Sequence, residues 1–181
     1  MHPMTLSHLQ SAFAGESQAH MRYLVYAEKA EKDEMPQIGR LFQAIAWAEQ
    51  IHASSHFVVM RDQFGAVQTV AGAGFGLGTT AENLAVAIEG EDFEVAEMYP
   101  VYQAAAEFQE ERGALRSFDW AWKAEQTHAA LFREAKAVAE AGGDLEIDQV
   151  NVCSRCGHTL VGDAPDRCPI CNAKKETYRA F

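Results

Sequence analysis

Basic residues are scarce in this sequence and long apolar runs are absent, and both absences limit its partners. Lysine and arginine number 15 against 26 aspartates and glutamates, for a formal net charge of −11. A surface of this sign repels the phosphates of nucleic acids and anionic membranes. No apolar segment is long enough to span a bilayer, and residues 1–10, MHPMTLSHLQ, lack the basic and apolar regions of a signal peptide. We therefore expect a cytoplasmic protein that binds neither nucleic acid nor membrane.

Cysteine is absent before position 153, and the four cysteines then form two Cys-x-x-Cys pairs. The pairs are Cys153 with Cys156 and Cys168 with Cys171. In a chain without an export signal, such clustering indicates a metal site rather than disulfide bonds. Four thiolates arranged as a tetrahedron suit either zinc or a single iron, and the spacing alone does not choose between them.

Proline is also scarce, with five residues, and the chain up to about position 141 has apolar residues at helical spacing. The pattern predicts four helices, over 5–32, 36–64, 79–111 and 114–141. Thr5 is a suitable N-cap for the first helix, and Pro36 suits the first turn of the second. Thr79, followed three residues later by Glu82, predicts a capping box at the start of the third helix.

Glycine is concentrated between the second and third predicted helices, in residues 69–78, TVAGAGFGLG. This segment does not match the Gly-x-Gly-x-x-Gly phosphate motif and follows no strand, so we interpret it as a crossover connection. Four helices joined by two short turns and one long crossover have the connectivity of a ferritin-like four-helix bundle. We therefore expect an all-α bundle over residues 1–145 and a small metal-binding domain over residues 146–181.

The pattern Glu-x-x-His occurs twice, as EQIH at 49–52 and EQTH at 125–128. Both pairs lie on the apolar stripes of their helices, and glutamates of the first and third helices do the same. The polar residues expected to face inward are Glu16, Glu49, His52, Glu91, Glu94, Glu125 and His128. Glu97 extends the series on the third helix, but we interpret it as a solvated side chain.

Several carboxylates inside one bundle require cations. An unpaired buried ion costs several kcal/mol, and five of them would exceed the typical net stability of a domain, about 5–15 kcal/mol. The apolar stripes carry too few basic residues to neutralise them, whereas metal ions can. Carboxylate and imidazole ligands together suit iron or manganese. One glutamate from each of two helices, with Glu-x-x-His from the other two, is the di-iron carboxylate arrangement.

Other histidines and tryptophans have less specific interpretations. His20 follows Glu16 by four residues, and His56 follows His52 by four. Either histidine could support a ligand from an outer layer or simply be bonded to another partner. We interpret the three tryptophans as packing residues: Trp47, Trp120 and Trp122.

With these motifs in place, the sequence resembles the rubrerythrin family over nearly its whole length. The resemblance is carried by AFAGES at 12–17 with Arg22 and Tyr23, AEQIH at 48–52, GEDFE at 90–94 with MYP at 98–100, AEQTH at 124–128, and the C-terminal pairs C-x-x-C-G and C-P-x-C. It implies two non-haem irons in a ferritin-like bundle and a rubredoxin-like domain with one iron on four cysteines. It also implies a cytoplasmic peroxidase that reduces hydrogen peroxide to water, with electrons from NAD(P)H through a separate reductase or rubredoxin.

The resemblance also assigns roles to individual residues. The residues that match the family's di-iron ligands are Glu16, Glu49, His52, Glu91, Glu94, Glu125 and His128. Glu94 and His52 match a pair that exchanges at one iron when it is reduced. Tyr23 and Tyr99 match tyrosines that hydrogen-bond ligand glutamates. The metal loaded in each site stays open, because zinc can occupy either.

Two further functions and one assembly remain open at this point. A ferroxidase or iron-handling protein would use the same bundle, although iron storage does not explain a thiolate iron. A third reading is an interaction module with structural zinc, although structural sites seldom use five carboxylates. The cysteine domain could dock on the bundle of a second subunit, so we expect a head-to-tail homodimer.

Overall fold

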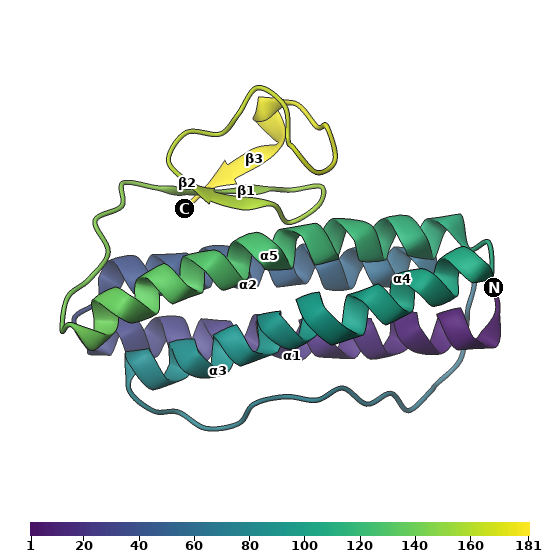
Figure 1. Ribbon diagram of the computed structural model, residues 1–181, viewed down its shortest axis with the longest axis horizontal. Helices are drawn as coiled ribbons and strands as arrows, with labels where there is room; N and C mark the ends of the chain where they lie inside the picture. Colours follow the sequence, from purple (N-terminus) through teal and green to yellow (C-terminus); the bar gives the residue numbers. More distant parts are fainter.

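Four long helical segments lie side by side, and a small sheet covers one face of them (Figure 1). The computed structural model describes residues 1–181. The helical elements are α1 (Pro3–Lys32), α2 (Pro36–Val59), α3 (Thr80–Phe93), the π-helix η1 (Glu94–Met98), α4 (Tyr99–Phe108) and α5 (Arg112–Glu140). Together α3, η1 and α4 form the third rod of the bundle. The expected ferritin-like four-helix bundle with one long crossover is confirmed.

Two of the three predicted helix starts are confirmed. Pro36 opens α2, and Thr79 and Glu82 form the capping box, with the Glu82 amide 3.3 Å from the Thr79 hydroxyl oxygen. The prediction for Thr5 is wrong, because α1 already begins at Pro3. Proline suits a first helical turn, and Thr5 instead is buried and donates its hydroxyl to Gln109 Oε1 at 2.5 Å.

The second helix ends earlier than predicted, at Val59 rather than near residue 64. The residues beyond Met60 are exposed, and Phe64 is 95% exposed. Helices in proteins are stabilised mainly by packing of their apolar face. Because residues 61–64 have nothing to pack against, the helical pattern in the sequence continues further than the helix itself.

The third predicted helix is interrupted by the π-helix η1. The Tyr99 amide donates to the Glu94 carbonyl, five residues back, instead of to the carbonyl four residues back. The indole Nε1 of Trp122 donates to the Val95 carbonyl at 3.0 Å. Trp122 therefore stabilises this irregular turn by a specific hydrogen bond and does more than the packing that we predicted for it.

Residues 60–79 form the crossover, which runs along the outside of the bundle beside α1 and α3 (Figure 1). A Cβ atom on Gly74 would lie 2.3 Å from Cγ1 of Val86 on α3, so only glycine allows this close approach. The carbonyl of Val70 accepts a hydrogen bond from the Ser11 hydroxyl at 3.1 Å. The glycine-rich segment is thus a strap held against the helices, as expected for a crossover.

The bundle core divides into two apolar clusters, one toward each end. One contains Tyr23, Phe42 and Phe132, and the other contains Leu9 and Phe118. The positions between the clusters on each helix are the predicted inward-facing glutamates and histidines. The polar centre is therefore enclosed at both ends by packed apolar side chains, which exclude water from it.

The C-terminal domain is a three-stranded antiparallel sheet. Its strands are β1 (Val150–Cys153), β2 (Thr159–Val161) and β3 (Tyr178–Ala180), in the order β2-β1-β3, with a short 3₁₀ turn η2 (Lys175–Thr177) before the last. Val150 and Val152 belong to the same apolar cluster as α2, so the sheet packs directly on the bundle. The division at residues 145 and 146 falls in the connection between α5 and β1 and stays a proposed boundary. No helix has the length and apolar character that crossing a membrane requires.

Candidate metal centre

The structure gathers the buried carboxylates and imidazoles into two groups that share members. The first group is Glu16, Glu49, His52 and Glu125, and the second is Glu49, Glu91, Glu125 and His128. Within each group one ligand atom per residue lies within 4.8 Å of all the others. Each of these six side chains is at most 2% exposed. The arrangement offers two adjacent metal positions with two glutamates in common.

The two shared glutamates are oriented symmetrically between the histidines. Nδ1 of His52 lies 3.3 Å from Glu49 Oε2 and 2.7 Å from Glu125 Oε1. Nδ1 of His128 lies 3.3 Å from Glu49 Oε1 and 2.6 Å from Glu125 Oε2. Because each carboxylate turns one oxygen toward each histidine, both can bridge a pair of ions. Glu16 and Glu91 then each supply one terminal carboxylate.

The donor set fits a pair of metal ions. Although histidine nitrogens lie nearby, one carboxylate oxygen on each of four buried glutamates accepts no well-aligned hydrogen bond: Glu16 Oε2, Glu49 Oε1, Glu91 Oε2 and Glu125 Oε1. A buried carboxylate without a partner is strongly unfavourable, and no lysine or arginine makes an ion pair with the cluster. Carboxylate and imidazole donors suit iron or manganese, so two such cations satisfy the free oxygens.

Without metal ions, the carboxyl groups of this cluster differ widely in pKa. Burial, with the nearby carboxylates of Glu125 and Glu16 adding to its effect, raises the pKa of Glu49 to about 7. Burial would also raise the pKa of Glu125, but the two neighbouring histidines lower it to about 2. The pKa of Glu91 lies well above its usual range, first because of burial and then because of Glu125. Without cations, the centre cannot hold all its carboxylates ionised.

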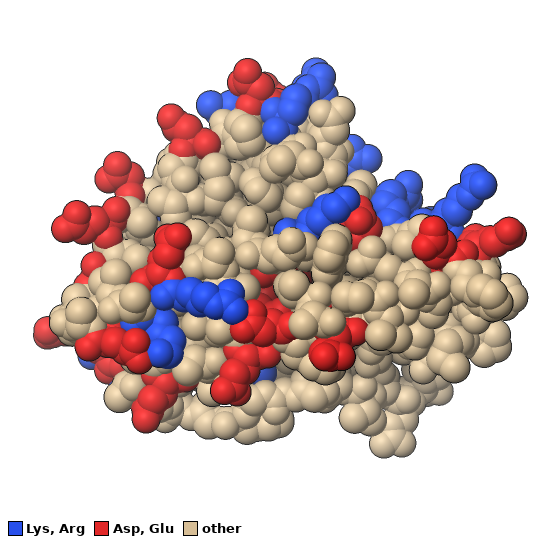
Figure 2. Space-filling model, viewed as in Figure 1, with Lys and Arg blue, Asp and Glu red and all other residues tan.

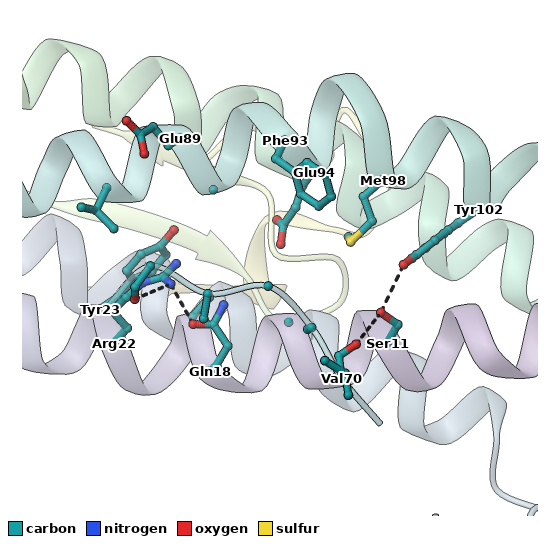
Figure 3. Close-up of a pocket in the computed structure, with 18 residues that line it drawn as sticks. Ser11, Gln18, Arg22, Tyr23, Val70, Glu89, Phe93, Glu94, Met98 and Tyr102 are labelled. Atoms are coloured by element: carbon teal, nitrogen blue, oxygen red, sulfur yellow. Dashed lines mark hydrogen bonds between the residues drawn. The ribbon is translucent and has the colours of Figure 1, made fainter. Parts of the chain in front are cut away.

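Glu94 is placed differently from the other predicted ligands. It belongs to neither group of four, and it lies at the start of η1 with its side chain only partly buried. Figure 3 shows its carboxylate directed into the space between the third rod and α1, where it lines a cavity. His52 lies with the clustered ligands instead. Whether Glu94 and His52 exchange at a metal stays a prediction.

The two tyrosines expected beside the centre donate to ligand glutamates. The Tyr23 hydroxyl donates to Glu91 Oε1 at 2.7 Å, and the Tyr99 hydroxyl donates to Glu16 Oε1. Burial raises the pKa of both phenols well above its usual value, with the glutamates adding to the effect. Both hydroxyls therefore stay protonated and can orient the terminal carboxylates.

His56 connects Tyr99 to a chain of hydroxyl groups. Its Nε2 lies 3.0 Å from the Tyr99 hydroxyl and its Nδ1 lies 2.8 Å from the Ser117 hydroxyl, which is 2.9 Å from that of Ser55. A carboxylate only accepts hydrogen bonds, so Tyr99 donates to Glu16 and accepts from His56. The same logic makes Ser117 the donor to His56. The sequence indicates His56, because it follows His52 by four residues, whereas no sequence pattern indicates Ser117.

The remaining polar residues near the ligands have ordinary roles. Glu97 is exposed, as predicted for a solvated side chain. Nδ1 of His20 lies 2.6 Å from the Ala46 carbonyl, on the outer side of α1 and α2. His20 is therefore bonded to the backbone of the neighbouring helix rather than to the centre.

The C-terminal domain contacts the metal centre of its own chain through both ligand histidines. Nε2 of His52 donates to the Cys156 carbonyl at 3.1 Å. Nε2 of His128 lies 3.0 Å from the Thr159 hydroxyl, a partner that sequence reasoning missed. A Cβ atom on Gly157 would lie 2.1 Å from His52 Nε2, so glycine is required at this contact. This contact lies within one chain, and the expected head-to-tail homodimer stays a prediction.

The four cysteines have the geometry of a tetrahedral metal site. None forms a disulfide, and the Sγ atoms of Cys153 and Cys171 are 3.7 Å apart, with those of Cys156 and Cys168 at 3.5 Å. A tetrahedron with metal–sulfur bonds of about 2.3 Å has edges of about 3.8 Å. The sulfurs therefore surround a volume of the right size for one ion. Three cysteines are buried, and Cys171 is partly exposed.

Comparisons with known proteins agree with both metal sites. The family model described as Rubrerythrin matches residues 7–136, and the model described as Rubrerythrin, rubredoxin-like domain matches residues 152–179. Rubrerythrin-2 of Clostridium acetobutylicum is 46% identical over 178 residues, which cover 98% of this chain and 97% of the relative. Nigerythrin of Nitratidesulfovibrio vulgaris is 31% identical over 98% of this chain and 86% of its own length.

The similarity extends to solved structures. Fully reduced, all-ferrous nigerythrin matches with a TM-score of 0.87 at 30% identity, covering 98% of this chain and 86% of the other. The mixed-valent state of nigerythrin matches with the same TM-score at 32% identity. A carboxylate–histidine pair site, a four-cysteine site and near-complete similarity to these proteins lead to one conclusion: this chain belongs to the rubrerythrin family.

Proposed function

We propose that this protein is a peroxidase that reduces hydrogen peroxide to water at its di-iron centre. Electrons come from an NAD(P)H-linked reductase, directly or through a rubredoxin, and pass through the four-cysteine iron. The observation that carries the proposal is the hydrogen bond from His52 Nε2 to the Cys156 carbonyl. It joins a residue of the di-iron site to a ligand residue of the cysteine site, as an electron route requires.

The proposed ligands of the di-iron site are Glu16, Glu49, His52, Glu91, Glu94, Glu125 and His128. Cys153, Cys156, Cys168 and Cys171 are the proposed ligands of the single iron. When bound, the two ferrous ions supply the two electrons that convert one hydrogen peroxide and two protons into two waters. The remaining contributions come from the protein: Glu49 and Glu125 hold the two positions together, and Tyr23 and Tyr99 orient the terminal glutamates.

We assign Glu94 and His52 as the pair that exchange with the redox state. In support, His52 lies among the clustered ligands while Glu94 is directed into the neighbouring cavity. Glu94 also begins the π-helix, a type of irregular turn that occurs often at functional sites. The looser backbone hydrogen bonding there gives Glu94 freedom to move without disturbing the helices on either side.

The contact between the domains favours redox chemistry over the two other readings. A structural zinc module would need no contact between its two sites, and a ferroxidase would need no electron donor. In this chain both ligand histidines donate to the cysteine domain, His52 to Cys156 and His128 to the Gly157–Thr159 turn. Each imidazole thus presents Nδ1 to the carboxylates and Nε2 to the electron donor.

The deciding experiment is anaerobic. Iron-loaded protein is fully reduced and then mixed with hydrogen peroxide or with oxygen, while the thiolate-to-iron charge-transfer band is followed. Rapid return of the colour with peroxide and slow return with oxygen supports the peroxidase. Equal or faster oxidation by oxygen favours the ferroxidase, and a complete lack of colour would mean that the cysteines do not hold iron.

We further propose a cytoplasmic homodimer. The four thiols are free of disulfides, which suits a reducing compartment. The dimer is the assembly that the family resemblance implies, and light scattering on the purified protein tests it. A single peak at twice the mass of the 19.9 kDa chain is expected; a monomer peak would contradict the dimer.

A further inference from the structure

We propose that the cavity beneath the crossover strap is the route by which the oxidant reaches the di-iron centre, and that it admits only small, uncharged hydroperoxides. The inference rests on the proposed peroxidase function and gives the glycine-rich segment a role. The cavity measures about 380 Å³ and lies between α1, strap residues 70–74 and the α3–η1 rod (Figure 3). This volume far exceeds the ~30 Å³ that one water occupies in the liquid.

The walls of the cavity lead from the surface to the ligands. Val70 and Phe93 at its outer side are 75% and 55% exposed, whereas Tyr23 at its inner side is 1% exposed. The Tyr23 hydroxyl donates to Glu91, and the Glu94 carboxylate lines the same space (Figure 3). A molecule in this cavity therefore lies next to Glu94 and is separated from Glu91 only by Tyr23.

Glycine keeps the space open on two sides. A Cβ atom on Gly15 of α1 would lie 3.8 Å from both Ala71 Cβ and Glu94 Oε1, so a longer side chain there would fill the gap between strap and Glu94. A Cβ atom on Gly90 of α3 would lie 3.5 Å from Arg22 Nη2. The strap can lie close to α3 because Gly74 has no side chain to meet Val86. Gly74 thus lets the strap lie close to α3, while Gly15 and Gly90 leave the space beneath the strap unfilled.

The polar groups of the cavity suit a neutral molecule that accepts a hydrogen bond. Arg22 donates through Nη1 to Gln18 Oε1 at 2.8 Å and to the Gly74 carbonyl at 3.3 Å, while its Nη2 makes no hydrogen bond. That free donor can bind a hydroperoxide oxygen. The carboxyl groups of Glu89 and Glu94 line the same space as the Arg22 guanidinium, so the cavity has no net positive charge to attract an anion. Peroxides that carry a carboxylate or are much bulkier than the cavity are excluded.

The first test fills the cavity. Gly15→Leu is expected to slow single-turnover oxidation of the reduced di-iron site by hydrogen peroxide by roughly ten-fold or more. Nitric oxide, a small neutral probe that binds ferrous ions without turnover, should bind more slowly as well. Ala104→Leu introduces the same side chain at an exposed position of α4 and should change neither rate. Iron content and the far-ultraviolet spectrum show whether each variant is folded and loaded.

A size series tests the same route without risking the fold. The rate should fall from hydrogen peroxide to methyl, tert-butyl and cumene hydroperoxide, and Gly15→Ala, which introduces only ordinary contacts at 3.8 Å, should make the fall steeper. Rates that are independent of size, or a folded Gly15→Leu protein that binds nitric oxide as fast as wild type, would overturn the proposal. If wild type instead prefers oxygen, the peroxidase fails, while slower nitric oxide binding in Gly15→Leu would still identify the route.

Discussion

At the scale of single residues, the hydrogen bonds around Glu16 all run in one direction. Ser55 donates to Ser117, which donates to His56, which donates to Tyr99, and Tyr99 donates to Glu16. Ser55 is partly exposed, while the members after it are buried. An ordered chain of donors from the surface to a ligand glutamate can pass protons inward, and peroxide reduction consumes two of them.

Ser117→Ala should interrupt this chain. The substitution removes the donor to His56 Nδ1, so the rate of peroxide reduction should fall several-fold and its solvent deuterium isotope effect should increase. The lost buried hydrogen bond should also cost about 1 kcal/mol of unfolding free energy. Stopped-flow measurements in H₂O and D₂O, with thermal unfolding alongside, check both effects.

Ser54→Ala is the matched control, because Ser54 lines one surface cleft together with Ser55 and Ser117 but makes none of the hydrogen bonds of the chain. Ser117→Thr restores the hydroxyl and should recover most of the rate. If Ser117→Ala loses stability but keeps the wild-type rate and isotope effect, the residue is only structural.

At the scale of elements, the interruption of the third rod begins at one of its two inward glutamates, Glu94. Glu91 ends its helical turn among the clustered ligands, whereas Glu94 begins η1 and faces the cavity. In a regular α-helix, residues three apart lie on the same face. The Glu94 amide still donates to the Gly90 carbonyl, four residues back, so the irregular turn begins only after Glu94, and the Trp122 hydrogen bond to Val95 stabilises it.

Trp122→Phe should destabilise the π-turn. The substitution keeps an aromatic ring but leaves the Val95 carbonyl without its donor, at an expected cost of about 1–3 kcal/mol. A crystal structure of the variant should show η1 shifted toward regular helix and Glu94 displaced. Trp47→Phe is the control, since Trp47 packs against Phe181 and the structure contains no hydrogen bond from its indole. Unchanged backbone at 94–98 in Trp122→Phe would contradict the assignment.

At the scale of the whole molecule, function depends on how closely the cysteine domain packs against the bundle. The tightest point is Gly157, where a Cβ atom would overlap His52 Nε2. The two domains also differ in net charge. Residues 151–181 contain five basic and three acidic side chains, whereas residues 1–150 contain ten and 23. The cysteine domain, where we propose that electrons arrive, is therefore weakly basic on an otherwise acidic protein.

Gly157→Ala should push the domains apart and slow electron transfer from the cysteine iron to the di-iron site. Gly162→Ala is a closely matched control: its φ of +82° resembles the +79° of Gly157, but a Cβ atom there meets nothing within 4 Å. Both variants carry similar backbone strain, of about 1 kcal/mol. Only Gly157→Ala should slow the return of the thiolate band after the di-iron site is oxidised. Equal rates in the two variants would show that the contact between Gly157 and His52 is not part of the electron route.

The charge division predicts that an acidic electron-donor protein docks on the cysteine domain. Arg116 and Arg155 lie 5.7 and 5.3 Å from the centroid of the Trp120 ring, which packs on the cysteine cluster. Figure 2 shows blue side chains over the C-terminal domain and beside its junction with the bundle. Reduction by such a donor should slow by roughly ten-fold between low and high salt. Arg155→Glu should have a similar effect, and Arg133→Glu, which breaks a pair with Asp92 on the bundle, should not.

Reduction by dithionite, which needs no protein docking, provides the reference rate. If Arg155→Glu slows both reductants equally, the arginine affects the iron itself rather than the approach of the donor.

The sequence by itself determined the ligand types, the four helices and the two metal sites. Helical periodicity is local, and carboxylates on apolar stripes need cations wherever the helices pack, so Glu16, Glu49 and Glu125 could be identified without a structure. Predictions from the sequence were wrong or incomplete where local signals compete with packing, as at Thr5, at the end of α2 and at Trp122. Only the tertiary structure decided that Glu94 faces a cavity, that Ser117 serves His56 and that Gly157 meets His52. These are contacts between residues far apart in the chain, and no local pattern records which of them folding brings together.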